Sequence, residues 1–322
     1  MANITASRKY GIDLSSPQLQ DLSDEIILKI FSFLHQKDLL QVAQVSKRTS
    51  VISKDSSLWT RVNFQWITVT TSFLQQVINR RCKDLNLGYA KLEGTLNLTG
   101  HSELKTLDIS NCKANEGVLE ELLGSCHSLE KIGMMNLTTI SPMMLRIVCE
   151  QNGRTLQFLN MKDCKGLFPL NAIELITSNC TQLSSLYILN VKISEDAVNH
   201  LLNFLNPNIE CLSIGYGHVV EDSHVEILVK RFKKIKQLGI KSRRISNLTV
   251  DHIVNNLKGT LRLLHLEAEN IFCEKLQDLK AMKQLQFLTG RRLRHNDGRR
   301  SEEIKRLREL LTNVKDIHIS SV

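Results

Sequence analysis

The chain has 322 residues, of which 42% are hydrophobic and 23% are charged, and its formal net charge is +9. The hydrophobic share is that of an ordinary globular protein, so it argues against a disordered chain and predicts a continuous core. No apolar run approaches the roughly 20 residues of a membrane-spanning helix, and the first residues lack the basic and apolar regions of a signal peptide. We therefore expect a protein of the cytoplasm, the nucleus or both.

Residues 1–18 are polar and of mixed charge, and they are predicted to form a flexible leader. From residue 19 the pattern becomes helical, because apolar residues between Leu22 and Leu34 recur every three or four positions. Ser23 stands where a helix N-cap is expected, followed by two acidic residues that suit the first turn. Asp38 is placed to cap a second short helix, and a third helical segment leads to residue 59.

The string LSDEIILKIFSFLHQKDLLQVAQVSKRTSVISKDSSLWTRVNF, within residues 19–63 and just beyond, resembles an F-box. The matching features are the helix from Leu22, the motif Asp38-Leu39-Leu40, the run from Val45 to Arg48, and Ser57-Leu58-Trp59. The chain departs from the family pattern at Ser23, where Pro is usual, and at Thr49-Ser50, where an aromatic residue is common. These departures leave open how strongly the segment binds an adaptor. The alternative interpretation is a helical cap for the repeats that follow.

Residues 64–100 are a transition. The apolar pattern from Phe73 to Ile78 predicts a helix, and Leu85-x-Leu87 and Leu96-x-Leu98 predict two short strands. We interpret the segment as imperfect entry repeats.

Residues 101–322 contain a ladder of apolar triplets with the pattern L-x-x-L-x-L, whose starts lie 24 to 29 residues apart. This period is typical of leucine-rich repeats, in which each unit contributes one strand and one helix. The predicted fold class is therefore α/β: a small all-helical F-box followed by a horseshoe solenoid with parallel strands on the concave face and helices outside. The triplets are Leu104-Leu107-Ile109, Leu129-Ile132-Met134, Leu156-Leu159-Met161, Leu183-Leu186-Ile188, Ile209-Leu212-Ile214, Ile235-Leu238-Ile240, Leu261-Leu264-Leu266, a degraded Leu285-Leu288, and Val314-Ile317-Ile319.

Side chains that alternate with the triplet residues should line the concave face. Aromatic and large apolar residues gather there in four successive repeats, in a polar surround typical of protein-binding hot spots, although local packing between strands would also explain them. The residues that we predict to bind a protein substrate are Met135, Phe158, Asn160, Tyr187, Leu189, Tyr216, Lys241, His265 and Arg291.

Basic residues are concentrated in the last third of the chain. Residues 227–250 contain eight basic side chains and no acidic one, and residues 291–308 contain eight basic and three acidic ones. A solvated surface, an acidic or phosphorylated protein partner, and nucleic acid are the three interpretations. Nucleic acid is the least favoured, because residues 291–308 contain no aromatic side chain for base stacking.

Sequence motifs for catalysis and for metal binding are absent. There is no G-x-S-x-G, no phosphate-binding G-x-x-x-x-G-K, no G-x-G-x-x-G and no H-E-x-x-H. The eight cysteines include no C-x-x-C pair, so we interpret them as small buried hydrophobic residues. We expect no catalytic residue, no cofactor and no metal.

The resemblance to F-box/leucine-rich-repeat proteins implies a division of labour. The helical unit would bind the adaptor Skp1 and through it a cullin and RING ligase, while the horseshoe would hold a substrate for ubiquitin transfer and degradation. The rivals are a repeat scaffold without ligase function and, less favoured, a phosphate- or RNA-binding solenoid. Carried over from the motif, the adaptor contacts would be Leu22, Ser23, Asp24, Glu25, Ile26, Ile30, Phe31, Leu39, Val45, Lys47 and Arg48.

Overall fold

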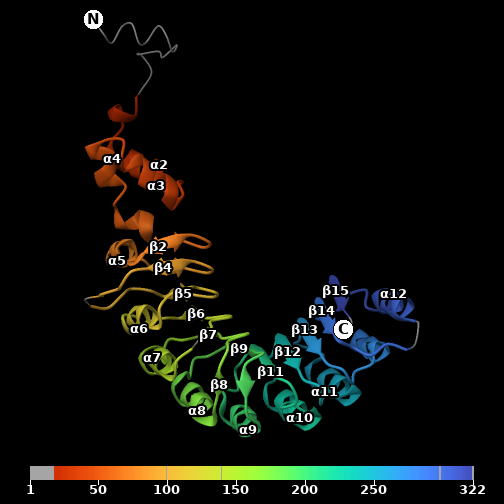
Figure 1. The fold of residues 1–322 in the computed structure, drawn as a ribbon. Coiled ribbons are helices and arrows are strands. Elements are labelled where there is room, and N and C mark those ends of the chain that lie inside the picture. Colours follow the sequence, from red (N-terminus) through yellow and green to blue (C-terminus); the bar gives the residue numbers. More distant parts are fainter. Residues whose placement is uncertain (1–17, 99, 139, 297–298, 321–322) are drawn as a thin grey trace, which may run out of the picture.

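The computed structural model describes residues 18–98, 100–138, 140–296 and 299–320, so the predicted leader lies almost entirely outside the described residues. A small group of helices leads into a curved solenoid, with strands along the inner side of the arc and helices along the outer side (Figure 1). Within the described ranges, no helix is long and apolar enough to cross a membrane.

Five short helices form the N-terminal unit. The first α-helix, α2, carries the predicted apolar stripe. Ser23 stands at its N-cap position, but the Ser23 side chain accepts no capping hydrogen bond. A hydrogen bond from Ser23 instead lowers the pKa of the exposed Glu25 carboxyl. Helix α3 begins two residues before Asp38, which therefore lies in the first turn and is not the cap. The elements are η1 (Leu19–Asp21), α2 (Asp24–Phe31), α3 (Gln36–Val42), α4 (Lys47–Ile52) and η2 (Ser56–Trp59).

Thr49, at a position where the family commonly has an aromatic residue, takes part in the capping of α4. The Ser46 hydroxyl accepts a hydrogen bond from the Thr49 amide at 3.1 Å, and the Ser46 amide donates to the Thr49 hydroxyl at 3.1 Å. This reciprocal capping box starts α4 without an aromatic side chain.

Trp59 joins the helical unit to the first repeat. Its indole Nε1 donates to the Ser53 carbonyl at 2.7 Å, its ring meets Phe73 edge-on at 6.1 Å, and the Arg80 guanidinium lies 4.6 Å from the ring centre. Because Trp59 is buried and contacts both sides, the helical unit is packed against the solenoid.

The entry repeats differ in detail from the prediction. The helix and the strand near Leu85 are present, whereas residues 95–98 form no strand. The strand Arg61–Asn63 was not predicted, because its three residues include one buried apolar side chain, Val62, and thus no readable alternation. The segments are β1 (Arg61–Asn63), β2 (Thr68–Thr70), α5 (Thr71–Asn79), β3 (Asp84–Asn86) and β4 (Lys91–Glu93), and β2 and β4 pair in a small outer sheet.

The concave sheet is parallel and has 11 strands, in the order β1-β3-β5-β6-β7-β9-β11-β12-β13-β14-β15. Its register aligns the triplets: Leu107 lies beside Ile132 on the next strand, and Ile132 lies beside Leu159. The further strands are β5 (Thr106–Asp108), β6 (Lys131–Gly133), β7 (Phe158–Asn160), β9 (Ser185–Leu189), β11 (Cys211–Gly215), β12 (Gln237–Lys241), β13 (Leu263–Glu267), β14 (Phe287–Arg291) and β15 (Asp316–Ser320), with β8 (Leu167–Phe168) and β10 (Lys192–Ile193) in a second outer pair.

The convex helices complete each repeat and bury the apolar stripe against the triplets. The predicted triplet residues from Leu104 to Leu288 are all buried, which confirms the ladder as the core. The helices are α6 (Glu116–Gly124), α7 (Pro142–Asn152), α8 (Leu170–Asn179), α9 (Glu195–Phe204), α10 (Asp222–Arg231), α11 (Asn247–Leu257), η3 (Cys273–Ala281) and α12 (Arg300–Leu310).

Gly290 occupies the third position of the incomplete triplet Leu285-Leu288. It stands in register between Leu266 and Ile319, where the other repeats have an apolar side chain. A Cβ at Gly290 would lie 2.6 Å from Leu293 and 2.8 Å from Ile319. Those two side chains occupy the space of the missing triplet residue, so the core continues through this repeat.

Candidate functional sites

The N-terminal helices expose large apolar side chains. Ile26 and Ile30 on α2 are 50% and 41% exposed, and Val45 before α4 is 74% exposed. All three belong to the predicted adaptor set. Apolar side chains that remain in solvent on so small a unit are typical of an interaction surface.

Three further exposed apolar residues were missing from the predicted set. Phe33 is 77% exposed, Val51 is 72% exposed, and Leu40 is also exposed. The wide apolar spacing of the segment was the available signal, because a small helical unit cannot bury every residue of such a stripe. We call Ile26, Ile30, Phe33, Leu40, Val45 and Val51 the helical apolar set.

Phe31 and Leu39 do not belong to that surface. Both are almost fully buried in the core, and Leu22 is half-buried against it. Phe31 and Leu39 therefore hold the helices together, and the motif match alone could not separate this role from adaptor contact.

Arg48 ties the start of α4 to the start of α2. Its guanidinium pairs with Asp24 at 2.7 Å and donates to the carbonyls of Gln20 at 2.8 Å and Leu22 at 2.6 Å. Arg48 and Asp24 thus have an internal role in addition to any contact with a partner. The remaining predicted contacts, Ser23, Glu25 and Lys47, are exposed.

On the concave face, Phe158 and Tyr187 form a pair. They lie on neighbouring strands, with ring centres 5.4 Å apart and planes tilted by 46°. The Tyr187 hydroxyl reaches past β11 and donates to Gln237 on β12 at 3.2 Å. Both rings are half-buried, so they pack locally and still present part of their surface to the concave side.

The other predicted apolar residues do not continue this pair as one band. Met135 and Asn160 are half-buried, whereas Leu189, in register with Gly215, is buried. Leu189 is 3% exposed, so it offers almost no surface to a partner in this structure.

Tyr216 lies in a separate, charged hollow of about 260 Å³ at the carboxyl ends of the strands. Lys241 pairs with Glu267 at 2.9 Å, and Arg292 contacts the same carboxylate at 3.3 Å. Arg292 also lies 3.5 Å from Glu269, which accepts from Arg243 at 2.9 Å. Three cations thus share two carboxylates beside an exposed tyrosine.

His265 lies in the strand row next to this hollow. Burial and then the neighbouring Arg291, Lys162 and Lys241 lower the pKa of His265 to about 4, while Glu267 opposes the shift. The imidazole is therefore neutral at physiological pH, and Arg291 at the end of β14 is exposed.

Most cations of residues 227–250 already have partners in the chain. Lys236 pairs with Glu210, Arg244 with Glu221, and Lys230 with Glu226. Lys233 and Lys234 donate to Asn256 and Asn208. This pattern favours the solvated-surface interpretation of the segment over a nucleic-acid site.

Burial makes several of the thiols less acidic than a free thiol. All eight cysteines are unlinked, and burial raises the pKa of Cys82 and Cys112 to about 12 and that of Cys273 to about 11. A raised pKa keeps a thiol protonated and unreactive. Cys273 does lie beside His295 and Glu303, a grouping that no sequence spacing indicated.

The chain is similar to several known proteins. Residues 19–65 match the F-box-like family model. A chain in the crystal structure of the Rad7 and Elc1 complex of yeast is similar over 98% of this chain and 90% of its own length, at 15% identity and a TM-score of 0.59. Internalin C2 of Listeria monocytogenes is similar over 78% of this chain and 84% of its own, at 13% identity and a TM-score of 0.41.

Proposed function

We propose that this chain, an F-box-like unit followed by a leucine-rich-repeat solenoid, is a non-catalytic substrate receptor of a ubiquitin ligase. The helical unit would bind an adaptor of the Skp1 type and through it a cullin and RING ligase. The solenoid would hold a protein substrate, so that a lysine of the substrate meets charged ubiquitin at high effective concentration. Such a receptor would act in the cytoplasm or the nucleus.

The observation that carries this proposal is the helical apolar set within the segment that matches the F-box-like family. Its six large apolar side chains stay exposed on a small helical unit whose residues Ile27, Phe31 and Leu39 are already buried in the core. Burial against an amphipathic helical partner would remove this surface from water, at about 25 cal/mol per Å². The similar yeast fold was solved in a complex with a second protein, which supports the proposal of a partner here.

The substrate face that we propose is the concave side around Phe158, Tyr187 and the charged hollow. Half-buried aromatic side chains supply contact area at low entropic cost. The hollow has one more cation than carboxylate, because Lys241, Arg243 and Arg292 share Glu267 and Glu269. We propose a protein substrate with an acidic or phosphorylated segment.

Adaptor binding is tested by calorimetry with the purified chain and a purified Skp1-type adaptor. Replacing Ile26 and Ile30 by Ala removes two exposed apolar contacts, and we expect affinity to fall at least about tenfold. The matched control is the double variant Ile227→Ala/Leu248→Ala. Ile227 on α10 and Leu248 on α11 are 41% and 50% exposed on the solenoid, so replacing them should leave the affinity for the adaptor unchanged. Equal affinities for the two double variants, or no binding by the wild type, would count against the proposal.

A further inference from the structure

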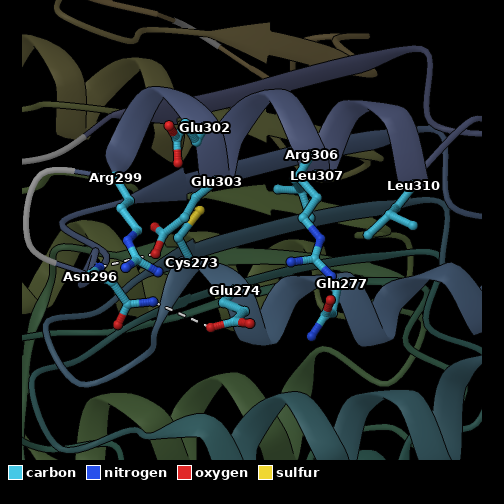
Figure 2. A pocket seen from close by; sticks show the side chains of 10 residues that line it. All are labelled: Cys273, Glu274, Gln277, Asn296, Arg299, Glu302, Glu303, Arg306, Leu307 and Leu310. Carbon is cyan, nitrogen blue, oxygen red and sulfur yellow. Dashed lines mark hydrogen bonds between the residues drawn. The ribbon is translucent and has the colours of Figure 1, made fainter.

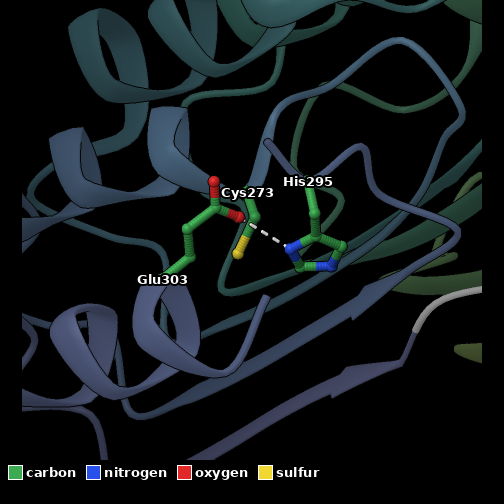
Figure 3. A group of neighbouring side chains, drawn as sticks. All are labelled: Cys273, His295 and Glu303. Atoms are coloured by element: carbon green, nitrogen blue, oxygen red, sulfur yellow. Dashed lines mark hydrogen bonds and ion pairs between the residues drawn. The ribbon is translucent and has the colours of Figure 1, made fainter. Parts of the chain in front are cut away.

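The last repeat contains a cluster of three metal-ligating side chains. One ligand atom each from Cys273, His295 and Glu303 lies within 4.8 Å of the other two. The residues come from three segments: the first residue of η3, the stretch after β14, and the first turn of α12 (Figure 3). The fold alone brings them together, because they are separated by 22 and 8 positions in the sequence.

The cluster is enclosed. Cys273 is 1% exposed, and the side chains of His295 and Glu303 are each 11% exposed. A hollow of about 160 Å³ adjoins it, lined by Cys273 and Glu303 together with Glu274, Asn296 and Glu302, among others (Figure 2). An ion would therefore have a route into the cluster and room for a water molecule beside it.

Two of the groups are held in place by hydrogen bonds. His295 Nδ1 and Glu303 Oε2 are 2.7 Å apart, and the backbone N–H of Asn296 donates to Glu303 Oε1 at 3.0 Å. His295 Nε2 is buried and has no hydrogen-bond partner among the described residues. The nitrogen that faces Glu303 is Nδ1, so Nδ1 is the atom that would bind an ion in the cluster, and Nε2 takes no part in it.

We propose that Cys273, His295 and Glu303 bind a zinc ion that fastens α12 to η3 and to the segment after β14. Sulfur, imidazole and carboxylate are the ligand types of zinc, whereas magnesium and calcium prefer oxygen alone. A thiolate and a carboxylate together balance the two charges of the ion, so the filled site is neutral and compatible with burial.

The geometry needs only a small adjustment. Ligand atoms around tetrahedral zinc lie roughly 3.3–3.8 Å apart, given bonds of about 2.0–2.3 Å. The ion replaces the proton between His295 Nδ1 and Glu303 Oε2, which must move apart by less than about 1 Å, and it displaces the proton of the Cys273 thiol. Water from the adjoining hollow fills the fourth position.

Such a staple suits its place in the fold. Helix α12 buries one residue fully, Leu307, and is otherwise rich in charged residues. A zinc ion shared by α12, η3 and the connecting segment would hold this helix in place. This inference is independent of the proposed ligase function.

The test uses the full chain, stripped of metal with a chelator and titrated with zinc in competition with a chromophoric chelator. We expect one zinc per chain, a rise in the thermal midpoint on zinc addition, and at least a tenfold loss of affinity in Cys273→Ser, His295→Gln and Glu303→Gln. Cys112→Ser, a half-buried cysteine elsewhere in the solenoid, is the matched control and should bind as the wild type does.

A spectroscopic measurement keeps the test independent of folding. Cobalt in place of zinc should give a sulfur-to-metal charge-transfer band that Cys273→Ser lacks and Cys112→Ser retains. Zinc that binds equally to all variants, a cobalt spectrum unchanged in Cys273→Ser, or no stoichiometric zinc would overturn the proposal. In that case the His295–Glu303 pair is a structural hydrogen bond only.

Discussion

At the scale of single residues, burial and neighbouring charge determine what each candidate side chain can do. Phe31, Leu39 and Leu189 fit their sequence patterns as binding residues, yet the fold buries them. A pattern of apolar spacing identifies the apolar face, but it does not say which members of that face are covered by the chain itself. Arg48 is a similar case, because its carbonyl partners come from residues 26 and 28 positions earlier.

His265 should make stability depend on pH. Its native pKa of about 4 lies below the unfolded value of about 6.5. The unfolded chain therefore takes up a proton first as pH falls, so the stabilisation is complete above about pH 6.5 and is lost as pH falls towards 4. Urea midpoints at pH 7.5 and 5 should differ more for the wild type than for His265→Gln. The exposed His218→Gln serves as control, and an equal pH dependence in all three proteins would refute the assignment.

Gly215 should tolerate no side chain. Its φ is +130°, and a Cβ would lie 2.0 Å from the backbone carbonyl oxygen of Lys241. We expect Gly215→Ala to destabilise the chain by at least about 2 kcal/mol in denaturant unfolding. Gly117→Ala, in α6 with open space around it, should instead stabilise by about 0.5–1 kcal/mol. Similar effects of the two substitutions would contradict the packing described for this strand end.

At the scale of elements, the regular repeats were predictable and the irregular ones were not. From Leu104 onward the period of about 26 residues specifies each strand and the side that it buries, since one residue per strand centre must face the core. The strand at Arg61 and the absence of one at residues 95–98 follow from tertiary pairing, which a single apolar residue or a local alternation does not encode. The group of Cys273, His295 and Glu303 likewise has no spacing signature.

The placement of α4 against α2 depends on Arg48. Arg48→Ala removes one ion pair and two hydrogen bonds to carbonyls, and because the side chain is partly solvated we expect a loss of about 1 kcal/mol. Arg48→Lys should recover only part of it, since an ammonium group cannot bond all three partners in the fork geometry of Arg. Thermal unfolding of the full chain measures the loss of stability, and hydrogen exchange of the backbone amides of α2 and α4 shows whether it arises in these helices. Unchanged protection in Arg48→Ala would show that the clamp contributes nothing.

At the scale of the whole molecule, the chain has two faces at different places on the arc. The helical apolar set belongs to the N-terminal helical unit, whereas the aromatic pair lies on β7 and β9 and the charged hollow lies at the carboxyl ends of later strands. The ribbon shows these strands along the inner side of the arc (Figure 1). Trp59 links the helical unit to the first repeat, so a partner on the helices would be held in a defined orientation to whatever the concave face binds. This arrangement suits a receptor, in which the distance between adaptor and substrate matters.

The alternative of a scaffold without ligase function shares the same fold and differs only in what assembles on the helices. The most direct measurement is recovery of a cullin, together with a Skp1-type adaptor, by affinity purification of the full chain from cells. We predict that wild type and Ile227→Ala/Leu248→Ala recover both proteins and that Ile26→Ala/Ile30→Ala recovers neither. A cullin retained equally by all three folded proteins, or absent from all of them, would contradict a ubiquitin-ligase receptor that docks through its F-box-like helices.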